Sequence, residues 1–407
     1  MKKASIIAVV FILLISFAGC GAHVSDTNGD DSMGGQGRRE GEGDLAVIEN
    51  SEEADALTDH VVTVQVDSEI EELEKGLSAV RYEGEDGFSA FLSEGGAKTD
   101  GEVVRFLADS FLAGNQGAFT MDTQAFGCST FSVQNLEGGY FFGRNFDWNA
   151  CNALILISYP EDGYASVSTV NQDFIRQGAG MAGSLLSDDM MVIAALYAPL
   201  DGMNEKGLCV SVNMIQDGST ISQSTGKRAL TTTTAIRLLL NQAATVEEAL
   251  ELLSQYDLHA SMNYMVHFAI ADADGNSVAV EYIDNEMVVT ETPVLTNFYL
   301  AEGEKQGIGT SQSHERFDIL TETLTGKPSM TQAEVRDALD SVSKDNFGEF
   351  GRSPQGGMRP RGSSETDSEC PIETTEWSIV FDQSALTATY YHRENYGNAY
   401  FFQITEE

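Results

Sequence analysis

The chain has 407 residues, with 63 acidic against 23 basic side chains, which gives a formal net charge of −40 at pH 7. A surface this acidic repels phosphate backbones and anionic lipids, so it excludes nucleic-acid binding and predicts a soluble surface. The five cysteines fit no zinc pattern, and neither a metal nor another cofactor is expected.

The first twenty residues have the pattern of an export signal. Lysines follow Met1, an apolar run covers Ile6 to Ile15, and small residues lead to Cys20. Residues 1–19 resemble a bacterial lipoprotein signal peptide, with Cys20 as the lipidated residue. The apolar run is shorter than the ~20 residues that a membrane-spanning helix needs. We therefore expect a cell-membrane lipoprotein held only by its N-terminal lipid anchor, with the catalytic region outside the cytoplasm.

Two segments separate the signal from the first strongly patterned region. Residues 20–60 are rich in Gly, Asp, Glu and Ser without periodicity, which predicts a disordered acidic tether. Residues 61–127 predict a mostly helical leader, because Ser68–Leu77 has helical spacing and Thr99–Glu102 forms a capping box. The helix after that box has an apolar face that we expect to pack on the catalytic domain, formed by Val103, Phe106, Leu107, Ser110 and Phe111.

The next segment predicts a β-hairpin. Cys128–Gln134 alternates small and apolar residues, Asn135–Gly139 supplies turn chemistry, and Tyr140–Phe146 returns as a second strand. Cys128 and Arg144 would then be near neighbours across the hairpin. A thiol reacts as a thiolate, and a nearby guanidinium stabilises that charge, so the pair predicts a reactive sulfur.

Asp147 follows this hairpin and needs a separate reason, since a carboxylate beside a thiolate opposes its ionisation. An α-ammonium on Cys128 supplies that reason, and it requires cleavage of the bond between Gly127 and Cys128. A free α-amine titrates near ~7.7–8.0 and a thiol near ~8.5, so an N-terminal cysteine combines nucleophile and general base without a histidine. The alternative is that Cys128 is an ordinary buried cysteine of a strand.

Short β-runs and helical blocks fill the rest of the chain. Apolar runs predict strands at 153–159, 191–197, 265–270, 277–283, 377–382 and 386–391. Helices are predicted over Thr231–Leu240 and after the capping boxes Thr245–Glu248 and Thr331–Glu334. Runs of strands with helices in blocks are typical of an α+β protein with antiparallel sheets. Residues 128–407 are enough to bury such a core as one domain.

Three later segments resemble known motifs. They are Gly202–Asn213, Pro293–Asn297 and Ser311–Phe317. The first two end in an asparagine, and the third carries an arginine. Together with the hairpin motif, and in the same order, they resemble the N-terminal-nucleophile linear amide hydrolases. That family includes choloylglycine (bile salt) hydrolase and penicillin V acylase, and more distantly acid ceramidase and N-acylethanolamine acid amidase.

The resemblance implies a four-layer αββα fold with two stacked antiparallel sheets over residues 128–407. It assigns the site to Cys128 as nucleophile, Arg144 and Asp147 as its polar partners, Asn213 and Asn297 as oxyanion-hole donors, and Arg316 as the residue that completes the site. Removing one such donor typically costs roughly 2.7–4 kcal/mol of transition-state stabilisation. Asn213 lies one residue earlier in its motif than in the bile salt hydrolases, so Asn204 stays an alternative.

These observations predict a hydrolase of linear amide C–N bonds that acts on a small-molecule N-acyl amide through an acyl-enzyme. By analogy with acid ceramidase, we expect leader and catalytic chain to stay associated non-covalently after the cut at Gly127–Cys128. An acyltransferase of the isopenicillin-N type and a ligand-binding surface lipoprotein are the alternatives. Bile salts, penicillin V, acyl-homoserine lactones and N-acyl lipids all stay open as substrates.

Overall fold

The structure is a computed structural model, and it describes residues 60–111, 127–178, 186–347 and 373–404. The predicted signal segment, Cys20 and the tether up to residue 59 lie outside the described residues. Within the described ranges, none of the helices combines the length and the apolar character needed to span a membrane.

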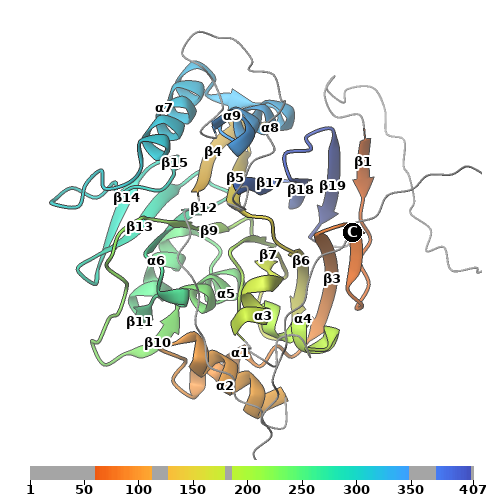
Figure 1. The fold of residues 1–407 in the computed structure, drawn as a ribbon, viewed down its shortest axis with the longest axis vertical. Helices are drawn as coiled ribbons and strands as arrows, with labels where there is room; N and C mark the ends of the chain where they lie inside the picture. Colours follow the sequence, from red (N-terminus) through yellow and green to blue (C-terminus); the bar gives the residue numbers. More distant parts are fainter. Residues whose placement is uncertain (1–59, 112–126, 179–185, 348–372, 405–407) are drawn as a thin grey trace, which may run out of the picture. The chain divides into compact units, whose positions relative to one another are not determined.

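Two β-sheets form the centre of the described part of the chain (Figure 1). Sheet A has the order β1 (His60–Thr63), β19 (Asn398–Gln403), β18 (Thr387–His392), β17 (Glu373–Asp382), β5 (Tyr140–Asn149), β4 (Gly127–Asn135) and β15 (Val294–Leu295), with β16 (Ser329–Met330) beside β4. Sheet B has the order β14 (Glu286–Glu291), β13 (Ser277–Ile283), β12 (Val266–Ala271), β9 (Cys209–Met214), β8 (Asp201–Asn204), β7 (Ser166–Asn171), β6 (Ala153–Pro160), β3 (Leu77–Gly84) and β2 (Glu71–Glu74). A separate parallel pair joins β10 (Arg228–Thr231) and β11 (Tyr256–His259).

Helices cover the outer faces of both sheets. Those that pack on sheet B are α1 (Phe88–Ser93), α2 (Asp100–Phe111), α4 (Asp188–Leu196), α5 (Thr232–Gln242) and α6 (Val246–Ser254), with α3 (Gln172–Gly178) beside α2 and α4. Those on sheet A are α7 (Ser311–Gly326), α8 (Gln332–Ser341) and α9 (Lys344–Phe347). Thr231, Thr245 and Thr331 are the N-caps of α5, α6 and α8, which confirms the predicted helix starts.

Three hydrophobic clusters separate the four layers, because successive strand residues point to opposite faces of a sheet. Phe142 and Ile379 of sheet A pack against sheet B, whereas the adjacent Phe141 and Val380 pack under α7 and α8. The third cluster lies between sheet B and its helices. The predicted αββα arrangement is therefore confirmed.

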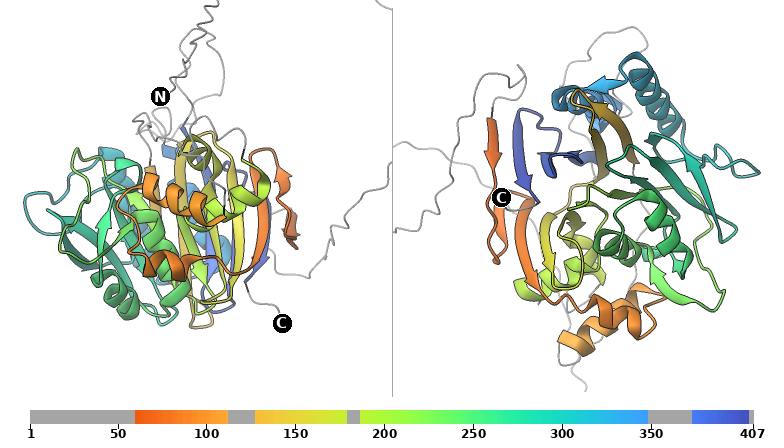
Figure 2. Two further views of the ribbon diagram at one scale, coloured as in Figure 1. Left: turned by 90° about the horizontal axis from the view of Figure 1, so that it is seen from below. Right: turned by 180° about the vertical axis from the view of Figure 1, so that it is seen from behind.

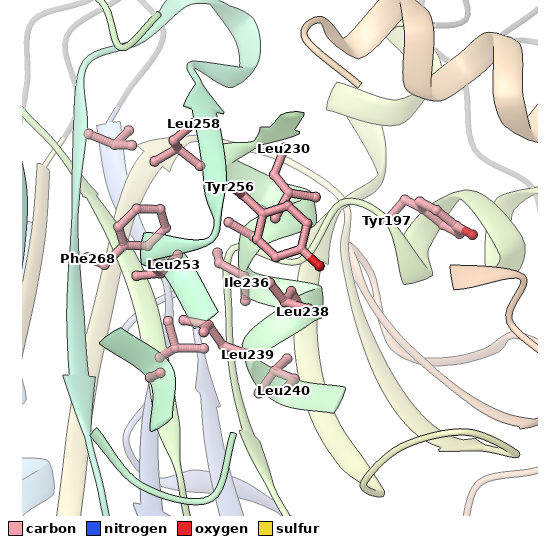
Figure 3. Packing of buried hydrophobic residues seen from close by; sticks show 14 of the residues in the cluster. Tyr197, Leu230, Ile236, Leu238, Leu239, Leu240, Leu253, Tyr256, Leu258 and Phe268 are labelled. Carbon is pink, nitrogen blue, oxygen red and sulfur yellow. The ribbon is translucent and has the colours of Figure 1, made fainter. Parts of the chain in front are cut away.

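Figure 3 shows how α5 fills this third cluster. Leu238, Leu239 and Leu240 of α5 lie in one cluster with Leu253 of α6 and Phe268 of β12. All five side chains are buried. Burying a leucine or phenylalanine in this way contributes roughly 1.5–3 kcal/mol each, so the cluster anchors the helical layer to the strands that carry the site.

The leader was expected to be mostly helical, but its described residues, 60–111, form strands as well as helices. Its residues supply β1 to sheet A and β2 and β3 to sheet B, besides helices α1 and α2. β3 pairs in parallel with β6, and β1 in parallel with β19, so the sheets are not wholly antiparallel. Both views in Figure 2 show these orange strands beside later parts of the chain. The leader is thus built into both sheets.

Two predicted elements were wrong, and each error has a local reason. Ser68–Leu77 was expected to be helical, but its acidic residues form β2 and a turn into β3, where Gly76 has a φ of +91° that favours glycine. Residues 191–197 were expected to be a strand but lie in α4. A short apolar run has no period that separates a buried strand from a buried helix, and Ser187 caps this one as a helix. The other five predicted strands are confirmed as β6, β12, β13, β17 and β18.

Candidate active site

Cys128 lies near the start of β4, in the hairpin that the sequence predicts. It pairs with Phe146 of β5, and Arg144 pairs with Thr130, so the cysteine and the arginine are diagonal neighbours. The Cys128 side chain is buried between the sheets, with only 2% of its surface exposed. Its backbone nitrogen donates a hydrogen bond of 2.8 Å to Oδ1 of Asn297, which lies two residues after the neighbouring strand β15.

Arg144 carries a positive charge into the space between the sheets, where its side chain has no exposed surface. Its guanidinium donates to Asn213 Oδ1 at 2.8 Å, to the Val212 carbonyl at 2.9 Å and to Asp201 Oδ2 at 3.3 Å. Burial by itself lowers the pKa of Arg144, but the interactions with Cys128 and Asp201 outweigh burial and raise it. Arg144 is therefore a permanent cation facing the thiol.

Asp201 is a member of this site that sequence reasoning missed. It opens the short strand β8 and is fully buried beneath Arg144, where Nε1 of Trp377 also donates to its Oδ2 at 3.0 Å. Burial raises the pKa of Asp201, while Arg144, Thr169 and Trp377 act in the lowering direction. Only the stacking of the two sheets brings these residues together, so the sequence carried no signal for the contact.

Asp147 lies opposite Gly127, the residue before the nucleophile. Its Oδ1 accepts a hydrogen bond of 2.8 Å from Thr375, and its Oδ2 lies 3.7 Å from Nη1 of Arg316. Oδ2 is buried and accepts no hydrogen bond from the described residues. A side chain at position 127 would place its Cβ 2.5 Å from this oxygen, so only glycine fits there. A carboxylate oxygen that accepts no hydrogen bond from the described residues thus lies against the bond before Cys128.

Arg316 of α7 links three parts of the site. It donates to the Cys128 carbonyl at 2.6 Å, to Ser129 Oγ at 2.6 Å and to Asn297 Oδ1 at 2.7 Å. Burial lowers the pKa of Arg316, against the opposing effect of Asp147 and Cys128. Asn297 completes the link, because its Nδ2 donates to the Met214 carbonyl at 2.7 Å. The helix and the β15 segment are therefore both fixed to the start of β4.

Asn213 does not have the surroundings expected of an oxyanion-hole donor. Its Nδ2 donates to the Leu295 carbonyl at 3.1 Å and to Thr130 Oγ1 at 3.5 Å, and its Oδ1 holds Arg144. Strand alternation is the reason, since Val212 and Met214 face the cavity beside Cys128 and Asn213 faces the other way. Asn213 is placed to orient Arg144.

Asn204, the alternative oxyanion-hole donor, joins a helix end to a turn. Its Nδ2 donates to the carbonyls of Leu240 and Ala243 at the end of α5. Its Oδ1 accepts from the backbone nitrogens of Lys206 and Leu208 in the turn between β8 and β9. Both ends of the amide are thus used for joining α5 to this turn, and no hydrogen bond links Asn204 to the residues around Cys128.

A fully buried histidine supports Asn297 from behind. His267 Nδ1 lies 3.0 Å from Glu281 Oε1, and its Nε2 lies 2.9 Å from the Thr296 carbonyl. The Thr296 carbonyl can only accept a hydrogen bond, so Nε2 of His267 is the donor in this contact. Burial raises the pKa of Glu281, but hydrogen bonds from His267 and from the backbone nitrogens of Leu300 and Ala301 outweigh it and lower the pKa. Glu281 and the Thr296 carbonyl thus hold the ring on both sides.

Replacing His267 by glutamine is expected to lower kcat by about 10–100-fold, because the Thr296 carbonyl loses its donor and Asn297 shifts relative to Cys128. Loss of the buried bond should also destabilise the protein by about 1–3 kcal/mol, measured as the free energy of urea unfolding. His259→Gln is the matched control, since Nε2 of His259 makes no hydrogen bond within the described residues. An unchanged kcat in His267→Gln would contradict this supporting role.

An apolar cavity of about 40 Å³ opens beside Cys128. Phe146, Trp148, Val212 and Met214 form part of its wall. Phe146 stacks on Trp377 with ring centroids 4.0 Å apart, which fixes the wall nearest the sulfur. Among the described residues, no group of three or more His, Cys, Asp or Glu side chains is placed to hold a metal ion. The cavity thus presents the sulfur of Cys128 within an apolar wall, while Arg144, Arg316 and Asn297 surround the cysteine outside this lining.

Comparisons with known proteins bear on this arrangement. Residues 128–298 match the family model of linear amide C–N hydrolases, choloylglycine hydrolase family. No curated protein sequence gives a significant match. Similar solved structures include penicillin V acylase from Agrobacterium tumefaciens, with 20% identity and a TM-score of 0.43 over 65% of this chain and 83% of that chain. A mutant conjugated bile acid hydrolase from Clostridium perfringens has 20% identity and a TM-score of 0.46, over 65% and 89% of the two chains.

The matched region begins at Cys128 and ends one residue after Asn297. It therefore contains the hairpin with Arg144 and Asp147, and the strand with Asn213, while Arg316 follows it in α7. These residues come from four different elements, and the fold gathers them around one thiol. Over residues 128–298, the chain is therefore similar to the choloylglycine hydrolase family of linear amide C–N hydrolases.

Proposed function

We propose that Cys128 is the N-terminal nucleophile of a linear amide hydrolase, released by cleavage of the Gly127–Cys128 bond. The observation that carries the proposal is the surroundings of the Cys128 nitrogen. Asn297 Oδ1 already accepts from it at 2.8 Å, and Oδ2 of Asp147, which accepts no hydrogen bond from the described residues, lies against Gly127. An α-ammonium has three N–H groups, so these oxygens suit the amine that appears after scission.

The mechanism uses the two groups of Cys128 in turn. The α-amine takes the thiol proton, and the sulfur attacks the amide carbonyl to give a tetrahedral oxyanion. The α-ammonium returns the proton to the leaving nitrogen, which leaves a thioester on Cys128. Water then attacks the thioester, giving its proton to the amine, and the thiol is restored as the acid departs.

Each of the remaining polar residues stabilises or orients one group in this mechanism. Asn297 Nδ2 has two N–H groups, of which the Met214 carbonyl takes one, so we assign the oxyanion to Asn297. Arg144, oriented by Asn213, stabilises the thiolate. Arg316 holds the Cys128 carbonyl and Asn297 in place. Asp147 orients the α-ammonium.

Cleavage would leave the leader attached to the catalytic chain. β3 pairs with β6 over eight residues, from Leu77 opposite Ala153 to Gly84 opposite Pro160, and β1 pairs with β19. These backbone bonds do not depend on the Gly127–Cys128 peptide. We therefore propose a non-covalent heterodimer of leader and catalytic chain. If Cys20 is lipidated, the leader also ties the enzyme to the membrane, which fractionation of a Cys20→Ala variant would check.

The purified mature protein is expected to yield, on N-terminal sequencing, a fragment that begins at Cys128 and co-elutes with the leader in gel filtration. That material should hydrolyse at least one member of a panel of bile salt conjugates, penicillin V, acyl-homoserine lactones and N-acyl lipids. An added amine acceptor separates hydrolysis from acyl transfer, because both share the thioester. Full activity in an uncut chain would overturn the proposal.

A further inference from the structure

A second apolar cavity, of about 90 Å³, adjoins the one beside Cys128. Its outer wall is helix α2 of the leader, through Val103, Val104 and Leu107, and α4 lies on the opposite side. Both cavities share one set of lining residues, namely Phe174, Leu200, Thr233, Ser261 and Met262. The two cavities therefore lie side by side between the nucleophile and the leader helix, and these shared residues separate them.

The leader also fixes the residue that divides the two cavities. Asp100, at the start of α2, accepts a hydrogen bond of 2.7 Å from the backbone nitrogen of Met262. Met262 has a φ of +55° and Asn263 a φ of +57°, a conformation that non-glycine residues rarely adopt unless neighbours hold them. The hydrogen bond to Asp100 stabilises Met262 in this conformation. It also engages Asp100, which among the described residues is the one charged side chain that lines either cavity.

We propose that the two cavities form one acyl-binding site for an unbranched aliphatic acyl group, and that helix α2 of the leader is its end wall. The inference rests on the proposed function, because the carbonyl carbon must reach Cys128. The apolar lining offers no ionic partner for a charged or heavily hydroxylated acyl group, whereas it suits methylenes. The leader is then a permanent part of the substrate site, and the side chain at position 107 sets how long an acyl chain fits.

A series of N-acyl p-nitroanilides with unbranched acyl chains from four to twelve carbons tests this on the mature protein. kcat/KM is expected to rise about fourfold for each added methylene until the site is full, which corresponds to the burial of one methylene. Leu107→Phe should move the optimum to a shorter chain, because the larger side chain fills the outer cavity. Leu107→Ala should move it to a longer chain.

Circular dichroism and urea unfolding should show that both variants keep the wild-type fold. Ser110→Phe, on the exposed side of α2, is the matched control and should keep the wild-type profile. If the wild type hydrolyses the series but neither position 107 variant alters the optimum, the acyl site is wrong and the proposed function stands. If no substrate in the series or in the broader amide panel is hydrolysed, the proposed function fails first.

Discussion

Cys128→Ala is expected to lose amide hydrolysis by about 10⁵–10⁶-fold in kcat, as removal of the nucleophile does in other acyl-enzyme hydrolases. In the proposed mechanism, one side chain and its own α-nitrogen provide both the attacking atom and the proton acceptor. No histidine contacts Cys128 through any hydrogen bond in the described residues that could take over the proton transfer. The measurement is single-turnover hydrolysis of whichever amide the wild type accepts.

Cys209→Ala is the matched control for this loss. Cys209 is also a buried strand thiol between the sheets, but burial and then Asp382 raise its pKa well above the usual range. An inert thiol of this kind can be removed with activity retained. If Cys128→Ala kept wild-type activity, or if Cys209→Ala lost it as completely, the sulfur of Cys128 would not be the nucleophile. Mass spectrometry of Cys128→Ala also shows whether the cysteine is needed for the cut.

Arg144→Met is expected to lower the free energy of unfolding by about 3–5 kcal/mol, the second large effect. The guanidinium has no exposed surface and is the cation paired with Asp201, so its removal leaves a buried carboxylate without a counter-charge. Activity should be lost as well, because the thiolate loses the charge that stabilises it. Urea denaturation followed by tryptophan fluorescence measures the stability, since Trp377 contacts Asp201 directly.

The double variant Arg144→Met with Asp201→Asn separates the two effects. It should recover part of the stability, because no buried charge remains, without recovering activity. The pH dependence gives a further check. The pKa of Asp201 is raised in the folded state, so its protonated form is favoured there, and stability falls as pH rises above the unfolded value through the folded one. The deficit of Arg144→Met relative to the double variant should therefore be larger at pH 8 than at pH 5, and an equal deficit would contradict the ion-pair explanation.

The hairpin that carries the site could be read from the sequence because its signals are local. Alternation with a period of two predicted the strands, and Asn135–Gly139 predicted the turn. The register then places Arg144 two residues along from the partner of Cys128. The starts of α5, α6 and α8 were equally accessible, since a threonine cap and the next helical turn lie within four residues of one another.

The roles of the asparagines could not be predicted from local sequence signals. Asn213 and Asn297 both end apolar segments, and both come close to the site. Strand alternation sends the Asn213 side chain to Arg144, whereas Asn297 reaches the Cys128 nitrogen. A shift of one residue reverses the face of a strand, so a motif that is one residue short changes what its asparagine contacts.

By itself, the sequence determined five of the predicted strands, the starts of three helices, the hairpin with its thiol and guanidinium, and the resemblance that the family match over residues 128–298 bears out. The tertiary structure decided that the leader enters both sheets, that Asp201 lies under Arg144, and that His267 and Glu281 hold the loop of Asn297. The physical reason is the range of the contacts. Period and caps act within a few residues, whereas Arg144 and Asp201 are 57 residues apart and meet only when two sheets stack.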